Sequence, residues 1–151
     1  MTEQEKELSA WYVIGTIILS ILLLVFVFCT QAHAQSAPLP AFTESNIIRA
    51  GIGEAASEGY EGLYAVSCAI FNRGTLKGVY GFKSRQVDKE PLWVWQMARR
   101  AYLNAKEAYS AGACQAYGTH WESVKFKEPY WAKNMIKTVK IGSHIFYKER
   151  K

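Results

Sequence analysis

The residue in this sequence whose type and setting best suit acid–base chemistry is Glu54. It lies among small and apolar residues in the run GEAASEGYEGLYAVSCAIFNRG, residues 53–74. A carboxyl group sheltered in this way keeps its proton, because burial disfavours the charged form. Such an acid can protonate a poor leaving group, for example a glycosidic oxygen. Most glutamates on helices are solvated surface charges, so this candidate needs support from the rest of the chain.

The spacing of apolar residues predicts a helix that carries Glu54 near its middle. Small and apolar residues recur at helical intervals over residues 47–56, and Thr43 or Ser45 can cap the first turn. This helix also contains two glycines, Gly51 and Gly53. Glycine costs a helix roughly 1 kcal/mol relative to alanine, so these two indicate close approach of another segment or of a ligand.

Three further elements complete the predicted domain. Residues 58–60 break the pattern, and an apolar second helix follows over residues 63–71. Pro91 opens a third helix that Gly112 closes. The predicted inward side of that helix consists of Leu92, Trp95, Met97, Ala98, Ala101, Tyr102 and Ala105. The stretches 137–141 and 144–148 alternate across a Gly-Ser turn and predict a hairpin. The fold class is therefore α+β, mostly helical, with a short antiparallel hairpin.

Four short motifs follow one another between residues 44 and 148. They are GEA, GYEG and AVSCAIFNR within residues 47–73, GVY with Phe82 at residues 78–82, GTHWE with PYW at residues 118–131, and IGSHIFY at residues 141–147. In this order they resemble the SleB-type cell wall hydrolases, a family that includes spore cortex-lytic enzymes and related bacterial and phage proteins. The resemblance implies a small lysozyme-like or lytic-transglycosylase-like catalytic domain over residues 44–151.

The resemblance also implies an activity, the cleavage of peptidoglycan between MurNAc and GlcNAc with Glu54 as the principal acid/base. Hydrolytic glycosidases ordinarily add a second carboxylate. Few candidates are present: Asp88 lies in an exposed charged connection, Glu58 lies one turn beyond Glu54 on the same helix face, and Glu61 and Glu122 lie in predicted turns or loops. A lytic transglycosylase needs no second carboxylate, because the muramoyl C6 hydroxyl attacks its own anomeric carbon. Glu54 then acts first as acid and afterwards as base.

Eight further residues are expected at the substrate. They are Asn72, Tyr80, Thr119, His120, Trp121, Glu122, Trp131 and Tyr147. Each has a structural alternative: aromatic rings also fill cores, Thr119 also suits a turn, and Asn72 and Arg73 at a helix end also satisfy carbonyl groups. His120 and His144 invite a metal interpretation, but the cysteines lack paired ligand spacing, so we expect no metal and no cofactor.

The amino-terminal segment, residues 1–34, has the composition of a signal peptide or a membrane anchor. From Trp11 to Cys29, nineteen residues carry no charge, which is long enough to cross a bilayer. Ala32-His33-Ala34 suits signal-peptide cleavage, and residues 35–43 have the composition of a linker. The acidic leading residues and the long apolar run favour an uncleaved anchor instead, so both alternatives remain open.

Charge and cysteine content agree with an exported protein. From Gln35 onward there are seventeen Lys and Arg against ten Asp and Glu, a net charge of about +7 that suits an anionic wall polymer or lipid headgroups. The basic residues form no nucleic-acid motif, so nucleic acid is not an expected partner. Cys68 and Cys114 either pair in an oxidising compartment or serve as small buried hydrophobic residues.

The sequence thus leaves two function classes. The first is an exported peptidoglycan-cleaving enzyme of the periplasm or cell wall, either anchored in the inner membrane or released from it, and either a phage endolysin or a bacterial hydrolase. The second is a membrane-tethered protein that binds the wall without turnover.

Overall fold

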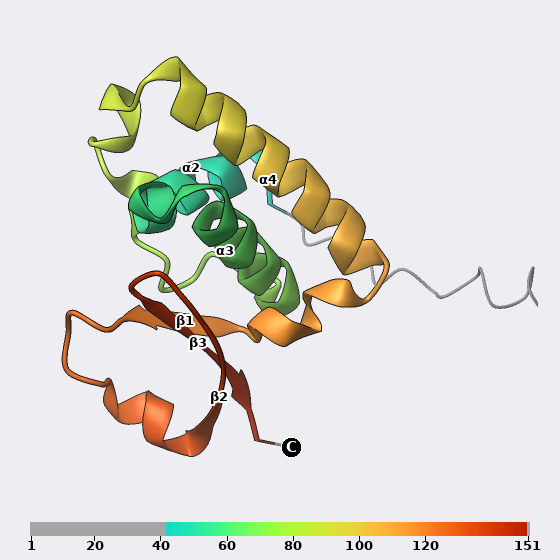
Figure 1. Cartoon of the computed structure of the whole chain (residues 1–151), viewed down its shortest axis with the longest axis vertical. Helices are drawn as coiled ribbons and strands as arrows, with labels where there is room; N and C mark the ends of the chain where they lie inside the picture. The colour runs from blue at the N-terminus through green and yellow to red at the C-terminus, as the bar shows by residue number, and fades with distance from the viewer. Residues whose placement is uncertain (1–41, 151) are drawn as a thin grey trace, which may run out of the picture. The chain divides into compact units, whose positions relative to one another are not determined.

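The computed structural model describes residues 42–150, which form an α+β domain of three main helices and a small three-stranded antiparallel sheet (Figure 1). The fold class predicted from the sequence is therefore confirmed at this level. The segment 1–34 and residues 35–41 of the expected linker lie outside the described residues. Within residues 42–150, no helix combines the length and the apolar character needed to cross a membrane.

Helix α2, Glu44–Ala55, confirms the first predicted helix and its cap. The side chain of Thr43 accepts a hydrogen bond from the backbone N–H of Asn46 at 3.3 Å, so Thr43 rather than Ser45 is the capping residue. The helix ends at Ala55 and a 3₁₀ turn, Ala56–Glu58, follows. Glu54 therefore lies in the last turn of α2 and not at its middle.

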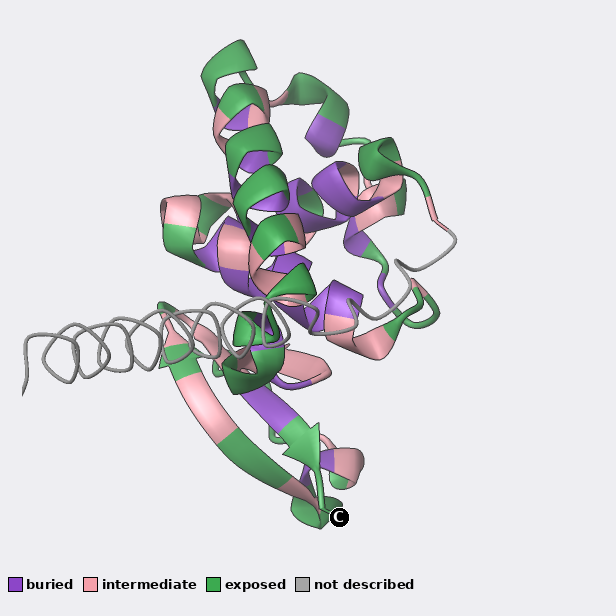
Figure 2. Cartoon of the chain, turned by 90° about the vertical axis from the view of Figure 1, so that its right-hand side faces the viewer, coloured by how far each residue is buried: buried purple, intermediate pink, exposed green. Residues whose placement is uncertain are grey.

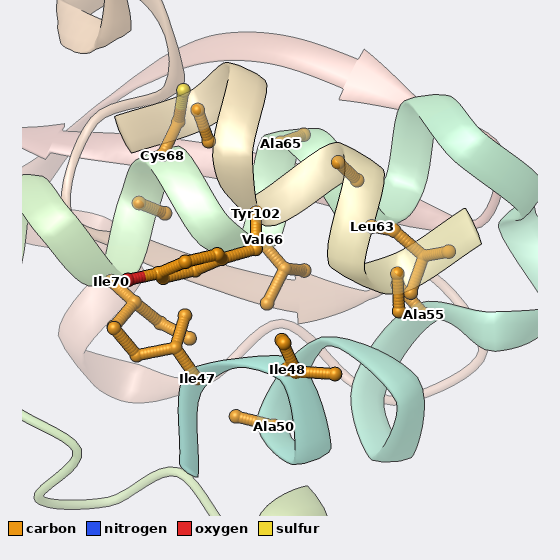
Figure 3. Close-up of a cluster of buried hydrophobic side chains, with 14 of the residues drawn as sticks. Ile47, Ile48, Ala50, Ala55, Leu63, Ala65, Val66, Cys68, Ile70 and Tyr102 are labelled. Atoms are coloured by element: carbon orange, nitrogen blue, oxygen red, sulfur yellow. The ribbon is translucent and has the colours of Figure 1, made fainter. Parts of the chain in front are cut away.

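Helices α3, Gly59–Arg73, and α4, Leu92–Ser110, pack on α2 to form the core. Figure 3 shows Ile47 of α2, Ile70 of α3 and Tyr102 of α4 gathered together in this core. Helix α3 begins four residues earlier than predicted, so Glu61 lies in its first turn and not in a loop.

The predicted inward face of α4 is wrong at one position. Leu92 is 72% exposed, whereas Val94, Ala98 and Tyr102 are buried. Two residues along a helix correspond to a rotation of about 200°, so the first-turn Leu92 points away from the face that begins at Val94.

A disulfide joins Cys68 of α3 to Cys114 of the 3₁₀ segment Ala113–Tyr117. Their Cα atoms lie 5.1 Å apart across a sequence separation of 46, and both residues are buried. The paired alternative is thus the one that the structure contains, and it fastens the segment before the sheet to the central helix.

The sheet has the order β1-β3-β2, with β1 at His120–Ser123, β2 at Met135–Ile141 and β3 at His144–Glu149. The predicted hairpin is confirmed as β2 and β3, with an irregularity between Lys137 and Lys140. Strand β1 was expected to be a loop, and its pairing with β3 places Glu122 in a strand. Figure 2 shows that burial reaches from the helices into part of β3, where Phe146 and Tyr147 are enclosed.

The backbone of α2 lies very close to the backbone of the 3₁₀ turn Gly81–Lys83. A Cβ atom on Gly53 would overlap the backbone carbonyl of Gly81, so only glycine fits there. The same atom on Gly51 would meet Leu63 Cδ2 at 3.6 Å, an ordinary contact. The expectation of a close approach therefore holds for Gly53 and fails for Gly51.

These two glycines give a matched test of the contact. We expect Gly53→Ala to lower the free energy of unfolding by about 1–3 kcal/mol, the usual cost of overpacking, because the turn at Gly81 must move. Gly51→Ala should be neutral or stabilising by up to about 1 kcal/mol, the gain in helix propensity. Chemical denaturation of both variants measures the difference, and equal effects would contradict the contact.

Reduction of the disulfide should lower the free energy of unfolding by about 3 kcal/mol, because it removes a cross-link that restricts the unfolded chain. Urea denaturation with and without reductant measures this loss. A Cys68→Ala/Cys114→Ala double variant is the control and should not respond to reductant. An unchanged denaturation midpoint for the unmutated protein would contradict the pairing.

Candidate active site

A groove of about 820 Å³ lies where the end of α2, the end of α3 and the sheet meet. Its walls combine residues from positions 54 to 144 of the chain. They are Glu54, Ser57, Arg73, Gly78, Tyr80, His120, Trp121, Glu122, Ser123, Lys125, Phe126, Trp131, Ser143 and His144. Glu54 and five of the eight predicted substrate residues, Tyr80, His120, Trp121, Glu122 and Trp131, are brought together here.

Glu54 is half-buried in the groove wall and has both carboxyl oxygens oriented. The backbone N–H of Gly81 donates to Oε1 at 2.7 Å, and the indole Nε1–H of Trp121 donates a longer bond to Oε2 at 3.4 Å. The short bond requires a glycine at position 81, because a Cβ there would lie 2.8 Å from Glu54 Oε1. The carboxyl group is thus sheltered in part and held in one orientation, with access to the groove.

Aromatic rings form one wall of the groove and are supported from behind. Trp131 lies 5.3 Å from the ring of buried Tyr147 and 5.4 Å from His120, and Trp121 lies 6.4 Å from buried Phe146. Rings fixed in this way present flat apolar faces, which suit the apolar faces of sugar rings.

Two more aromatic side chains that line the groove project into solvent. Tyr80 is 78% exposed and Phe126 is 70% exposed. Large apolar rings left exposed beside a groove are typical of a surface that binds a ligand.

Three of the predicted substrate residues do not line the groove. Tyr147 is only 2% exposed and serves as core behind Trp131. The hydroxyl of Thr119 shares a hydrogen bond of 2.8 Å with Nδ1 of His120 and so orients that ring. Both residues support the wall without belonging to it.

Asn72 has the structural role that the sequence left open. Its side-chain amide donates to the carbonyl of Cys114 at 2.7 Å and to the carbonyl of Gly118 at 2.8 Å. These bonds fasten α3 to the segment before β1, next to the disulfide.

The charge of Arg73 influences the neighbouring imidazole of His120 in the groove wall. Burial lowers the pKa of His120 below its ordinary value of 6.5, and the positive charge of Arg73 lowers it further, against the opposing charge of Glu149. His120 is therefore a neutral imidazole at neutral pH. Burial also lowers the pKa of Arg73, but a guanidinium stays protonated in proteins at neutral pH.

Glu58 has a role that sequence reasoning missed. It was expected beside Glu54 on one helix face, but α2 ends before it and the 3₁₀ turn directs its carboxylate to the β2–β3 turn. There Glu58 accepts hydrogen bonds from the backbone N–H of Ser143 at 3.0 Å and from the hydroxyl of Ser143. Nδ1 of His144 lies 3.6 Å from the same carboxylate, and both side chains are 11% exposed. Glu58 thus holds two groove residues in place.

Several groove residues were not among the substrate residues predicted from the sequence. They are Ser57, Gly78, Ser123, Lys125, Phe126, Ser143 and His144. The sequence could have indicated them only by their position, because most of them fall within or directly beside the four motifs.

The remaining carboxylate candidates, Glu61 and Asp88, are exposed and do not line the groove. Asp88 is exposed and pairs with Arg49 at 2.6 Å, which confirms the predicted exposed connection. Within residues 42–150, no cluster of three or more His, Cys, Asp or Glu side chains is placed to hold a metal ion.

Comparisons with known proteins return no match to a family model, to a curated protein or to a solved structure. The resemblance to SleB-type hydrolases therefore stays a prediction that depends on the four motifs.

The contacts of Glu58 with Ser143 and His144 form a clamp on the β2–β3 turn. From this clamp we predict how the stability of the protein depends on pH. Hydrogen bonds from Ser143, chiefly that of its hydroxyl, lower the pKa of Glu58 below its ordinary value of 4.5. Stability that depends on this carboxylate is fully present above the ordinary pKa and is lost as pH falls through the lower folded-state pKa. Glu58→Gln should therefore be less stable than the unmutated protein at neutral pH, and the difference should shrink only below about pH 4.5.

Urea denaturation at a series of pH values measures this difference. Glu107→Gln, at an exposed position on α4, is the matched control and should show little change at any pH. A difference that grows as the pH falls would contradict the clamp.

Proposed function

We propose that this protein cleaves the glycan strands of peptidoglycan as a lytic transglycosylase, with Glu54 as the acid/base. The observation that carries the proposal is the placement of Glu54. Its carboxyl group is oriented by the Gly81 N–H at the wall of a groove that also presents the rings of Tyr80, Trp121 and Trp131. Cleavage of a glycosidic bond needs at least a positioned proton donor and a surface that binds the sugar, and the oriented carboxyl and the aromatic rings can supply these two functions.

The reaction needs one proton carrier. Glu54 donates its proton to the oxygen that links MurNAc C1 to the next sugar, and the C1–O bond breaks as positive charge develops at C1. The C6 hydroxyl of the same MurNAc then attacks C1 and returns its proton to the Glu54 carboxylate. The products are a 1,6-anhydroMurNAc end and a sugar with a free 4-hydroxyl, and Glu54 is protonated again.

Glu122 is the second carboxylate on the groove, and it distinguishes this route from hydrolysis. Its Oε1 accepts the backbone N–H of Ser123 at 2.9 Å. A hydrolase would use such a group as nucleophile or as base for water. In the transglycosylase route it has no proton to transfer and serves only in binding.

Two further observations support an exported enzyme of this type. The buried Cys68–Cys114 disulfide suits an oxidising compartment such as the periplasm. The lysozyme-like assignment agrees with a helical domain that carries its acid at the end of a helix beside a small sheet. Peptidoglycan lies outside the inner membrane, so the segment 1–34 would deliver this domain there as leader or anchor.

The proposal predicts that Glu54→Gln loses at least about a hundredfold in lytic activity, the usual contribution of a positioned acid/base. Zymograms on purified peptidoglycan measure activity, and mass spectrometry of the products detects 1,6-anhydroMurNAc. Glu122→Gln is the matched control and should still form anhydro ends.

Full activity of Glu54→Gln would overturn the proposal. Products that lack anhydro ends, together with an inactive Glu122→Gln, would indicate a two-carboxylate hydrolase. Binding to peptidoglycan without any clearing would favour the wall-binding alternative.

A further inference from the structure

The guanidinium of Arg73 lies in the groove wall without a protein anion to balance it. Arg73 is in the last turn of α3 and is half-buried. Its Nη2 lies against Gly78, where an added Cβ would come within 3.2 Å. Among the hydrogen bonds and ion pairs found within residues 42–150, none involves this guanidinium. By contrast, Arg49 pairs with Asp88 at 2.6 Å and Arg99 pairs with Glu44 at 3.3 Å.

This arrangement is costly for the free protein. A charge taken out of water destabilises the fold unless it is paired, and burial is the dominant influence on Arg73, lowering its pKa. His120, whose pKa the charge of Arg73 lowers, is neutral and gives no compensation. The carboxylates of Glu54 and Glu122 are each engaged by a backbone N–H, of Gly81 and of Ser123. The arginine thus keeps its N–H donors for something else.

A structural role for Arg73 is the alternative explanation. A positive side chain in the last turn of a helix interacts favourably with the helix dipole. That interaction is weak at an exposed helix end and does not require the side chain to line a groove. It predicts a loss of stability when the charge is removed, which can be measured directly.

We propose that Arg73 binds a carboxylate of the substrate and thereby sets which sugar of the alternating strand lies at Glu54. This inference depends on the proposed function for the identity of the polymer. A planar guanidinium can bind a carboxylate in bidentate geometry, through two parallel N–H···O hydrogen bonds. In a peptidoglycan strand the lactyl group of the muramoyl sugar is joined by an amide bond to the stem peptide, whose free carboxylates are therefore attached to that sugar, and the other sugar is neutral. An arginine in the same groove as the acid therefore fixes the register of the alternating strand relative to Glu54.

The test measures binding and needs no turnover. Full-length Glu54→Gln is cosedimented with intact peptidoglycan and with peptidoglycan whose carboxylates have been converted to amides. The same is done for Glu54→Gln/Arg73→Gln. The matched control is Glu54→Gln/Arg100→Gln, which removes an equal charge from an exposed position on α4.

Blocking the carboxylates should weaken binding of Glu54→Gln by about tenfold, the loss of one charge-assisted pair open to water. Arg73→Gln should cause a similar loss on intact polymer and no further loss on blocked polymer. The Arg100 control should respond to blocking as Glu54→Gln does. Glycan strands stripped of stem peptides show how near the sugar the carboxylate must lie, because removal of the peptide takes away its carboxylates and leaves a free lactyl carboxylate in their place.

Equal weakening by Arg73→Gln on intact and blocked polymer would overturn the inference, as would no weakening at all. A lowered thermal midpoint of Arg73→Gln together with unchanged binding would assign the residue to the helix end. If Arg73→Gln does not fold, Arg73→Lys replaces it, because lysine keeps the charge but cannot bind a carboxylate in bidentate geometry. Blocking the polymer carboxylates should then weaken binding of Arg73→Lys by less than it weakens binding of the protein with Arg73. The proposed function fails separately, through lytic activity of Glu54→Gln, so the two failures are distinguishable.

Discussion

The bond between the Gly81 backbone N–H and Oε1 of Glu54 is the interaction on which the site depends. It requires two backbones to meet with no side chain between them, since a Cβ on Gly53 would overlap the Gly81 carbonyl and one on Gly81 would crowd the Glu54 carboxyl. Because the donor belongs to the main chain, it cannot rotate away from the carboxyl as a side chain would. The acid is therefore oriented by the fold itself.

The rest of the groove is built onto this fixed point from the sheet side. Glu58 holds the β2–β3 turn through Ser143, while Asn72 holds the residues that lead into β1. Glu58 comes shortly after α2 and Asn72 lies in the last turn of α3, so the packing of these two helices also determines where the sheet lies. Trp121 of β1 and Trp131 of the 3₁₀ segment Tyr130–Asn134 then line the groove together with the Glu54 carboxyl.

The helices and the hairpin could be predicted because their apolar residues recur with the period of the element. Strand β1 could not, because four half-buried residues are too few to show alternation, and its partner β3 lies more than twenty residues away. Glu58 was placed wrongly because helical spacing extrapolates a helix past its true end, and only the turn after Ala55 redirects the side chain. Leu92 was misplaced by the same kind of extrapolation at a helix start.

The motifs marked the region of the groove, but they did not decide which of their side chains reach it. Tyr147 and Asn72 are of types that often bind ligands. Tyr147 is nevertheless enclosed, and the amide of Asn72 donates to backbone carbonyl groups. Sequence alone carries no information on which face of a strand, or which end of a helix, meets another part of the chain.

The fastening of α3 to the residues before β1, by one covalent bond and two amide hydrogen bonds, has a mechanical consequence. His120 and Trp121 directly follow the fastened residues, so their positions are fixed relative to α3. The part of the groove wall that they form cannot move independently of the core. Any change in the width of the groove is therefore left to exposed residues such as Lys125 and Phe126, which also line it.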